Sequence, residues 1–535
     1  MKLIIIFIIG LVLLCLNLSV VYINFFQKKS LRIILSISSL LIINAIIYLG
    51  LKVVNVLDLT FFIYIAVLPF IASLVFLFSN KEKPSQEEKK KKIVLEHEKG
   101  RIEYNNPFNG FLGYGGAESG KTASIGKPLL KQYMLNHFAG FVYDAKENDY
   151  TLTALQIKEE INYPYPIYNL DFLDVNRSYR TNIFCPQVIT EPLLVPEFSE
   201  LFFVSFLKEG ERQNEWFDMA LGTFKAVAWI FYNYFPEYCS LPHICNFIVH
   251  TEPDNLLKLV SQDDTAKSYA GALINSQGSE RTFSSILTTL SKYISDFAGN
   301  RNACYILSGD DFLYNPLDPE NPKMICVSNH FRARNIISPL VVLLFTTIAK
   351  QIKFGNQIPI VFFLDEATTF KIPDLEAYPS ELREYLVAFV MLTQSAGKIE
   401  KKYNKYDRSS LESNLANQFY GWTADILALQ TYSQQFSKAD EKMRSITTGD
   451  NRSTSTTTSI RKEVRYDGEF FGNLKPGEFV GKCKNANVKT FHTRFKPYTG
   501  GKKEELPKLR EISSQDIEQY YQNLIQDVKA IKFNS

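Results

Sequence analysis

The sequence predicts a mixed α/β protein with three parts: a P-loop core, an all-α domain inserted into that core, and an N-terminal transmembrane helical anchor. Three observations carry this prediction. The first eighty residues are dominated by apolar runs, the segment "GGAESGKT" has the spacing of a phosphate-binding loop, and a later apolar run ends in Asp365 and Glu366.

Three apolar runs predict the anchor: 3–23, 31–51 and 59–78. Each approaches the ~20 residues that a helix needs to cross a bilayer. The first run is too long for a signal peptide, and no small-residue cleavage site follows it. Basic residues lie between the first two runs and after the third, so the positive-inside rule places the N-terminus outside and the main body of the chain in the cytoplasm.

The charge balance outside the anchor limits what the rest of the chain can bind. The net charge is +3, but beyond residue 80 the chain carries 54 Lys and Arg against 55 Asp and Glu. This balance excludes an overall basic surface, so any nucleic-acid contact must come from a local patch or a channel lining.

The seven cysteines include no C-x-x-C pair, which is typical of a reducing compartment. Cys239, His243 and Cys245 lie close together in the sequence. No fourth ligand has the spacing of a zinc site, so buried apolar cysteines are the favoured interpretation.

Residues 81–105, which begin "KEKPSQEEKKKK", are charged and poor in apolar side chains, and predict a solvated linker. The core follows as two parts, residues 106–190 and 301–500, with the inserted all-α domain at 191–300 and a helical tail at 501–535. The insert is predicted from apolar residues at helical spacing, such as Phe198, Leu201 and Phe202.

The phosphate-binding loop is predicted at residues 115–123. Its two outer glycines permit a tight turn, Lys121 reaches the β- and γ-phosphates, and the Thr122 hydroxyl can bind Mg²⁺. A strand "FLGYG" precedes the loop and a helix follows it, so the helix N-terminus stabilises phosphate charge. The predicted nucleotide-binding residues are Gly115, Gly116, Ala117, Glu118, Ser119, Gly120, Lys121, Thr122 and Ala123.

Two carboxylates follow the apolar run 358–364, which predicts a buried parallel strand. Asp365 can hold Mg²⁺, with Thr122 as the other metal ligand, and Glu366 can orient and deprotonate the attacking water. A helix N-cap is the alternative for this pair when it is considered without the loop.

Two further residues are candidates for catalysis. Gln394 ends the strand "YLVAFVMLTQ" and can contact the γ-phosphate, although it can also be an ordinary loop residue. Arg383, eleven positions earlier, can stabilise transition-state charge on a neighbouring subunit's phosphate, or it can be a surface arginine.

Strands are also predicted at 141–145, 165–171, 324–329, 417–423 and 477–483. The Ser/Thr-rich stretch "TTGDNRSTSTTTS" predicts a mobile loop.

The motif order resembles the type IV secretion coupling proteins, the TraG-type ATPases of bacterial conjugation. The resemblance rests on the anchor, "GGAESGKT", "FVYDAK", "EWFDMALGTFKA", "VFFLDE" and "VMLTQS". It implies a RecA-like motor that binds ATP and Mg²⁺, forms a homo-hexamer on the bacterial cytoplasmic (inner) membrane, and passes relaxase-bound single-stranded DNA to a secretion channel. It also implies the nucleotide roles of Lys121, Thr122, Asp365, Glu366 and Gln394.

Two features depart from that family: three predicted membrane spans where two are common, and Glu118 in the loop. Two other functions stay open at this point. One is a receptor that recruits protein effectors without pumping DNA, and the other is a chromosome-segregation DNA translocase.

Overall fold

The computed structural model describes residues 91–207, 211, 213–436, 438–448 and 454–531. The three apolar runs, and therefore the predicted anchor, lie outside these residues. Within the described part, the helical segment Phe331–Gln351, a 3-10 turn (Phe331–Ala333) followed by an α-helix, is long and apolar enough to cross a membrane, but 56% of its most apolar window is buried. That burial is typical of a core helix of a soluble domain.

The centre of the molecule is a nine-stranded sheet in the order β13-β12-β9-β3-β8-β7-β4-β6-β5. The seven strands from β9 to β5 are parallel, and β12 and β13 extend the sheet antiparallel. The predicted mixed α/β fold is therefore confirmed. The strands are β3 (Phe111–Tyr114), β4 (Ala139–Asp144), β5 (Ile167–Leu170), β6 (Met324–Ser328), β7 (Ile360–Leu364), β8 (Val387–Thr393), β9 (Asn417–Tyr420), β12 (Glu478–Lys482) and β13 (Thr490–Arg494).

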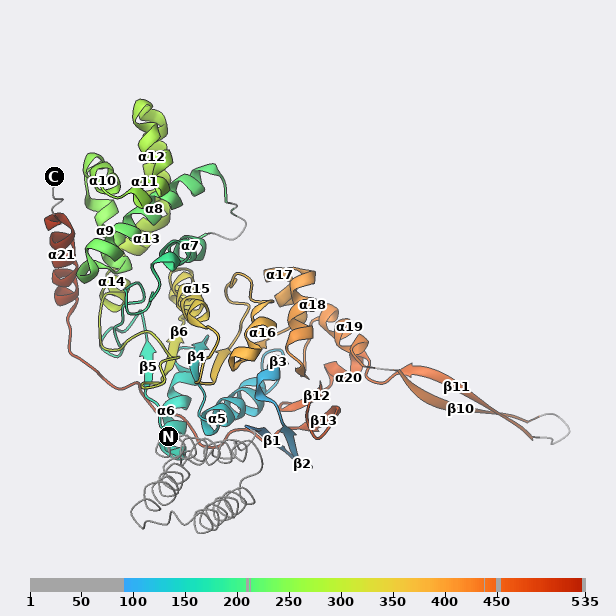
Figure 1. Cartoon of the computed structure of the whole chain (residues 1–535). Helices are drawn as coiled ribbons and strands as arrows, with labels where there is room; N and C mark the ends of the chain where they lie inside the picture. Colours follow the sequence, from blue (N-terminus) through green and yellow to red (C-terminus); the bar gives the residue numbers. More distant parts are fainter. Residues whose placement is uncertain (1–90, 208–210, 212, 437, 449–453, 532–535) are drawn as a thin grey trace, which may run out of the picture. The chain divides into compact units, whose positions relative to one another are not determined.

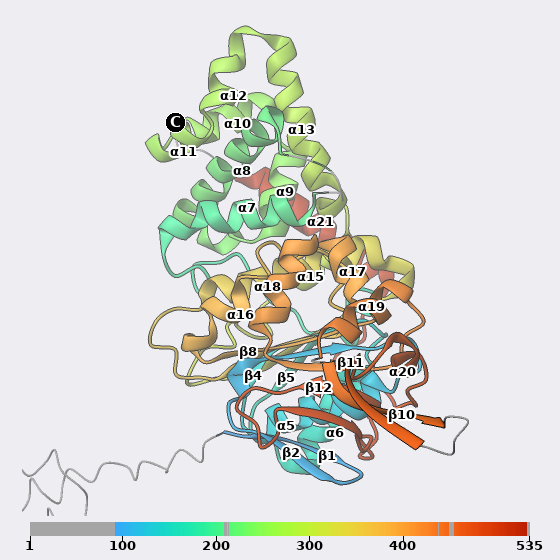
Figure 2. The ribbon, with the colours of Figure 1, turned by 90° about the vertical axis from the view of Figure 1, so that its right-hand side faces the viewer.

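Both faces of the parallel sheet are buried, which explains why its central strands are continuous apolar runs. Alternate residues of β7 belong to different cores: Phe362 and Leu364 to one, Val361 and Phe363 to the other. In Figure 2, one group of helices covers the lower face of the sheet and another group covers its upper face. The lower helices are α5 (Lys127–Leu135) and α6 (Asp149–Ile161), and the upper ones are α15 (Arg334–Gln351), α16 (Tyr378–Glu381), α17 (Ala396–Lys402), α18 (Lys405–Asn414) and α19 (Ile426–Gln434).

An all-α part lies between β5 and β6 in the sequence. In Figure 2 it is above α15. Its aromatic residues pack on one another: Phe202 stacks on Phe224 and meets Phe297 edge to face, which makes these aromatics core residues. Its helices are α7 (Val195–Ser205), α8 (Glu215–Tyr234), α9 (Leu241–His250), α10 (Pro253–Val260), α11 (Asp264–Tyr269), α12 (Gly271–Asn275), α13 (Glu280–Ala298) and α14 (Arg301–Leu307).

The tail forms one helix, α21 (Ser514–Ala530), which packs against α9 and α14 of the all-α part. Cys239 and Cys245 are buried free thiols, and His243 pairs with Ser240. Among the described residues no cluster of three or more His, Cys, Asp or Glu side chains could hold a metal ion.

The structure differs from the sequence-based expectations in two segments. Residues expected in the charged linker form a β-hairpin of β1 (Ile93–His97) and β2 (Gly100–Tyr104), because Ile93, Leu95 and Ile102 are buried against the lower core. The expected Ser/Thr-rich loop is wrong for residues 447–448 and 454–459, which belong to a second hairpin.

That second hairpin consists of β10 (Lys438–Thr448) and β11 (Thr454–Val464), which extend away from the sheet in Figure 1. Threonine is β-branched and favours extended backbone, so a Thr-rich segment can form a strand when a partner strand is available. The short helix α20 (Gly468–Gly472) follows the hairpin.

Candidate nucleotide site

The predicted phosphate-binding loop follows β3 at the carboxyl edge of the parallel strands. The amides of Gly115 and Gly116 donate to the carbonyls of Thr393 (3.1 Å) and Trp422 (2.7 Å), so the loop is tied to the ends of β8 and β9. Gly120 has a φ of +81°, and a Cβ there would lie 2.4 Å from the backbone nitrogen of Gly477. Only glycine fits this position.

A helix begins directly after the loop, at Lys121, as the π-helical turn Lys121–Gly126 that continues into α5. The first amides of a helix have no acceptor within it, and they carry the positive end of the helix dipole. This arrangement suits a phosphate group. Ala117 and Glu118 are exposed at the tip of the loop, and Ala123 is exposed on the first helical turn.

Lys121, Asp365 and Glu366 come together at this edge. Lys121 is buried, and its Nζ lies 3.6 Å from Oε2 of Glu366. Burial lowers the pKa of Lys121, while Glu366 and Asp365 oppose that shift. Two carboxyl groups and one lysine side chain therefore lie close together and are largely shielded from water.

Asp365 directly follows β7 and is only 1% exposed. Burial raises its pKa to about 7, although Lys121 and Lys146 counteract the shift. Among the described residues its Oδ2 has no hydrogen-bond partner, and the same is true of the Oγ of Ser119 in the loop. Two buried oxygens without partners fit the requirements of a hydrated Mg²⁺ ion bound with phosphate.

Glu366 is positioned by the strand next to its own. Its Oε1 accepts hydrogen bonds from the hydroxyls of Thr368 (3.0 Å) and Thr393 (3.2 Å). Its backbone is left-handed, with φ 48°, so the chain turns sharply between the two carboxylates. Sequence reasoning missed both threonines, although Thr393 stands directly before the predicted Gln394.

A second cation, Lys146, was also missed. Its Nζ donates to the Oγ1 of Thr122 at 3.1 Å, where the sequence predicts a Mg²⁺ ligand. Lys146 is positioned by Asp144, a fully buried carboxylate at the end of β4 that accepts the amides of Lys146, Tyr150 and Thr151. The sequence signal that could have identified Lys146 is its position directly after the predicted strand in "FVYDAK".

Gln394 follows β8 at the same edge, and its Oε1 accepts a hydrogen bond from Lys398 on α17. Arg383 does not join the other candidates. It precedes β8, and the seven residues of β8 at about 3.3 Å each put roughly 20 Å between it and Gln394. Its Nη2 donates to the carbonyl of Asn414 at 2.8 Å.

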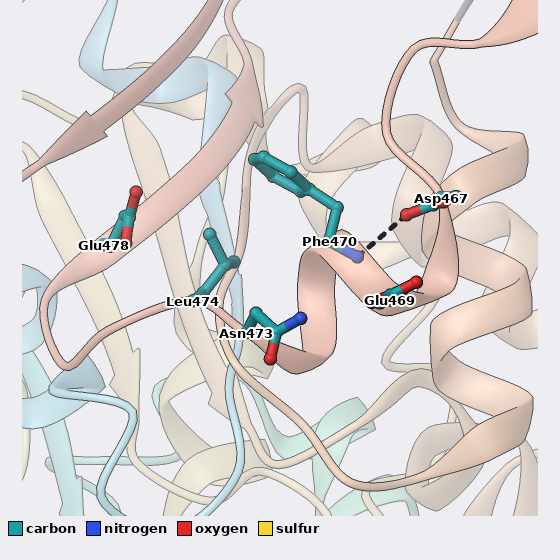
Figure 3. Close-up of a pocket in the computed structure, with 6 residues that line it drawn as sticks. All are labelled: Asp467, Glu469, Phe470, Asn473, Leu474 and Glu478. Carbon is teal, nitrogen blue, oxygen red and sulfur yellow. Dashed lines mark hydrogen bonds between the residues drawn. The ribbon is translucent and has the colours of Figure 1, made fainter.

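A separate pocket lies beside α20 and is lined by three carboxylates and one aromatic ring (Figure 3). Phe470 donates its amide to Asp467 there, and Glu469 and Glu478 add further negative charge. A polyanion would be repelled, so this pocket is a poor phosphate site. The loop that follows β3 is the better candidate.

Comparisons of the sequence and of the fold relate the chain to known proteins. A family model, "Type IV secretory system Conjugative DNA transfer", matches residues 77–466. No curated protein sequence matches the chain significantly.

Solved structures of the bacterial conjugative coupling protein TrwB are similar in fold. The unbound form of TrwBdeltaN70 has a TM-score of 0.59 at 12% identity, with 79% of this chain and 93% of that chain covered. TrwB in complex with ADP and Mg²⁺ has a TM-score of 0.56 at 13% identity, with 75% and 87% covered.

Proposed function

Because the chain belongs to the type IV secretory system conjugative DNA transfer family, we propose that it is a membrane-anchored ATPase that couples ATP hydrolysis to DNA transfer through a secretion channel. The observation that carries the proposal is the meeting of Lys121, Asp365 and Glu366 beside the loop after β3. TrwB, which has a similar fold, has been solved with ADP and Mg²⁺ and with a non-hydrolysable ATP analogue.

The site residues divide the chemistry of hydrolysis among them. The loop amides and Lys121 bind the β- and γ-phosphates, and Lys146 is a second cation within reach of the same phosphates. Thr122 and Asp365 would hold Mg²⁺, which when bound neutralises charge on the phosphate oxygens. Glu366, fixed by two hydroxyls, orients the attacking water and accepts its proton. Gln394 contacts the γ-phosphate.

The wider assembly is also part of the proposal. The chain acts as a homo-hexamer on the bacterial cytoplasmic membrane, anchored through its N-terminal apolar runs, with relaxase-bound single-stranded DNA as substrate. The electrically balanced body means that DNA contacts are concentrated where subunits line a shared channel. A receptor for protein effectors is the second candidate, because the nucleotide site does not itself identify the cargo. The family description, which specifies DNA, favours the first candidate.

ATP hydrolysis by the full-length protein in detergent tests this proposal. Glu366→Gln should reduce turnover at least ~100-fold, because general-base catalysis contributes 10²–10⁴, while ATP and Mg²⁺ remain bound. Glu384→Gln is the matched control, because Glu384 is an exposed glutamate before β8, at the opposite edge of the sheet. Near-normal hydrolysis by Glu366→Gln would remove Glu366 from this role.

The same assay separates the two cargo hypotheses. Single-stranded DNA of arbitrary sequence should raise the ATPase rate of the wild-type assembly several-fold, and the stimulation should fade between about 50 and 200 mM salt as phosphate contacts are screened. An active assembly that ignores DNA at every concentration would favour protein-only export.

A further inference from the structure

We propose that the turn at residues 330–334, which joins β6 to α15, is a contact site for single-stranded DNA. This inference rests on the proposed function and names residues through which the protein contacts its DNA substrate. The turn carries Phe331, a large apolar side chain that is 78% exposed. Arg332 and Arg334 beside it are exposed, and among the described residues neither forms an ion pair.

The arrangement of the three side chains suits a nucleic-acid strand. The guanidinium carbon of Arg334 lies 5.6 Å from the centre of the Phe331 ring, so a flat cation extends the aromatic surface. Sequence-independent binders of single strands combine such an aromatic ring, on which a base stacks, with arginines that neutralise phosphates. An exposed phenylalanine followed by two arginines that form no ion pair among the described residues is complementary to a strand of bases and phosphates.

The turn is also fixed to the nucleotide edge by hydrogen bonds. Asn329, directly before it, donates its amide to the carbonyl of Asp144 (2.9 Å) and its side-chain nitrogen to the Tyr143 hydroxyl (3.1 Å). Asp144 in turn positions Lys146, whose Nζ donates to Thr122 of the phosphate-binding loop. A short bonded path therefore joins the DNA-contacting turn to the ATP site.

His330 adds a second connection to the same edge. Its Nε2 lies 3.1 Å from Oδ1 of Asp171, and this hydrogen bond raises the pKa of His330. The Asp171 carboxylate beside the turn is thus paired within the protein, which reduces its repulsion of an approaching phosphate.

The chain contains a matched control for this turn. Phe354 follows the other end of α15, is 93% exposed and is preceded by the exposed Lys353. The 18 residues of α15, at about 1.5 Å each, keep the two phenylalanines roughly 27 Å apart. Phe354 is therefore at least as exposed as Phe331 and has a neighbouring cation, but it lacks the hydrogen-bonded path to the ATP site.

Binding of a fluorescein-labelled oligothymidylate of about 30 nucleotides to the full-length protein in detergent, with a non-hydrolysable ATP analogue, tests the stacking role. Phe331→Ala should weaken binding about tenfold, within the range for loss of one stacked base. Phe331→Trp should restore affinity, since tryptophan also stacks. Phe354→Ala should leave affinity unchanged.

The arginines are tested by the salt dependence of the same binding. The double variant Arg332→Gln/Arg334→Gln should reduce the slope of log affinity against log salt by about 1.4, because each phosphate contact with a single strand contributes about 0.7. Lys353→Gln should leave the slope unchanged.

Three outcomes would overturn the assignment. Equal binding by Phe331→Ala, the double arginine variant and the Phe354 control would mean that the turn does not contact DNA. Loss of oligomer by Phe331→Ala in sedimentation, with DNA affinity per assembled particle preserved, would make the turn a subunit interface. A wild-type assembly that hydrolyses ATP but binds no oligothymidylate would instead contradict the DNA element of the proposed function itself.

Discussion

Asp365 and Glu366 are consecutive residues, yet their carboxylates are in different environments. Asp365 is 1% exposed, and its Oδ2 has no hydrogen-bond partner among the described residues, whereas the Glu366 side chain is 19% exposed and accepts two hydroxyl hydrogen bonds. The left-handed backbone at Glu366 separates the two groups. This difference supports the proposed division of roles, with Asp365 for a cation and Glu366 for a water molecule.

This difference predicts a pH-dependent stability for the nucleotide-free protein. Burial raises the pKa of Asp365 from 3.8 to about 7, so between these values the folded protein holds a proton that the unfolded chain has released. The free energy of unfolding therefore falls as pH rises across that window. Asp365→Asn avoids the cost of ionising this buried carboxyl group, which amounts to at most about 4 kcal/mol. The variant should therefore raise the melting temperature at pH 8 by several degrees, and by less near pH 5.

An opposite sign is expected for a control carboxylate. Burial acts to raise the pKa of Asp149, but hydrogen bonds from Lys502 and Lys127 outweigh it and the net pKa is lowered. Asp149→Asn should therefore destabilise the protein at pH 8. A wild-type protein that is at least as stable as Asp365→Asn from pH 5 to pH 8 would contradict the assigned burial cost.

Among the elements, α21 connects parts of the chain that are far apart in sequence. Leu524 and Ile525 pack with Cys304 of α14, and the Tyr521 hydroxyl donates to Asn246 of α9 at 3.0 Å. The Arg301 guanidinium also lies 4.2 Å from the centre of the Tyr521 ring. The tail therefore stabilises the all-α part, to which it adds one helix.

A core substitution in α21 should affect that part selectively. Leu524→Ala should cost about 2–5 kcal/mol, because Leu524 is 2% exposed and the truncation leaves a cavity. Hydrogen exchange should then accelerate in α9 and α14, with nucleotide affinity unchanged. Gln526→Ala, at an exposed position two residues further along the helix, is the control. Unchanged protection of α9 in Leu524→Ala would show that the tail contributes little to this part.

The elements also show what sequence reasoning could and could not predict. Strands buried on both faces, such as β7, are continuous apolar runs with a polar end, so their type and their functional edge were predictable. The strand β13 alternates exposed and buried residues, and β1 directly follows a lysine run, so neither stood out. The positions of Lys146 and Trp422 depend on loops after β4 and β9, whose geometry follows from tertiary packing.

At the scale of the whole molecule, the place of Arg383 restricts how it can act. It precedes β8 at the edge opposite to Gln394, so it cannot reach the nucleotide of its own subunit. Its Nη2 is bound to a backbone carbonyl, while its Nε is buried and has no partner among the described residues. If Arg383 takes part in hydrolysis, it acts on a neighbour in a head-to-tail ring.

Mixing two inactive variants tests action between subunits. Lys121→Ala removes a cation from the phosphate site, and Arg383→Ala removes the arginine that would act on a neighbouring subunit's phosphate. A ring made of either variant alone should therefore be inactive. In mixed rings, some interfaces join an intact phosphate site to an intact Arg383, and partial ATPase activity should return with a maximum at intermediate ratios. A Glu384→Gln subunit, altered next to Arg383 but retaining it, should restore activity with Lys121→Ala at least as well. If mixed rings are shown to form and no ratio restores hydrolysis, Arg383 has no role in trans, and its bond to Asn414 is structural.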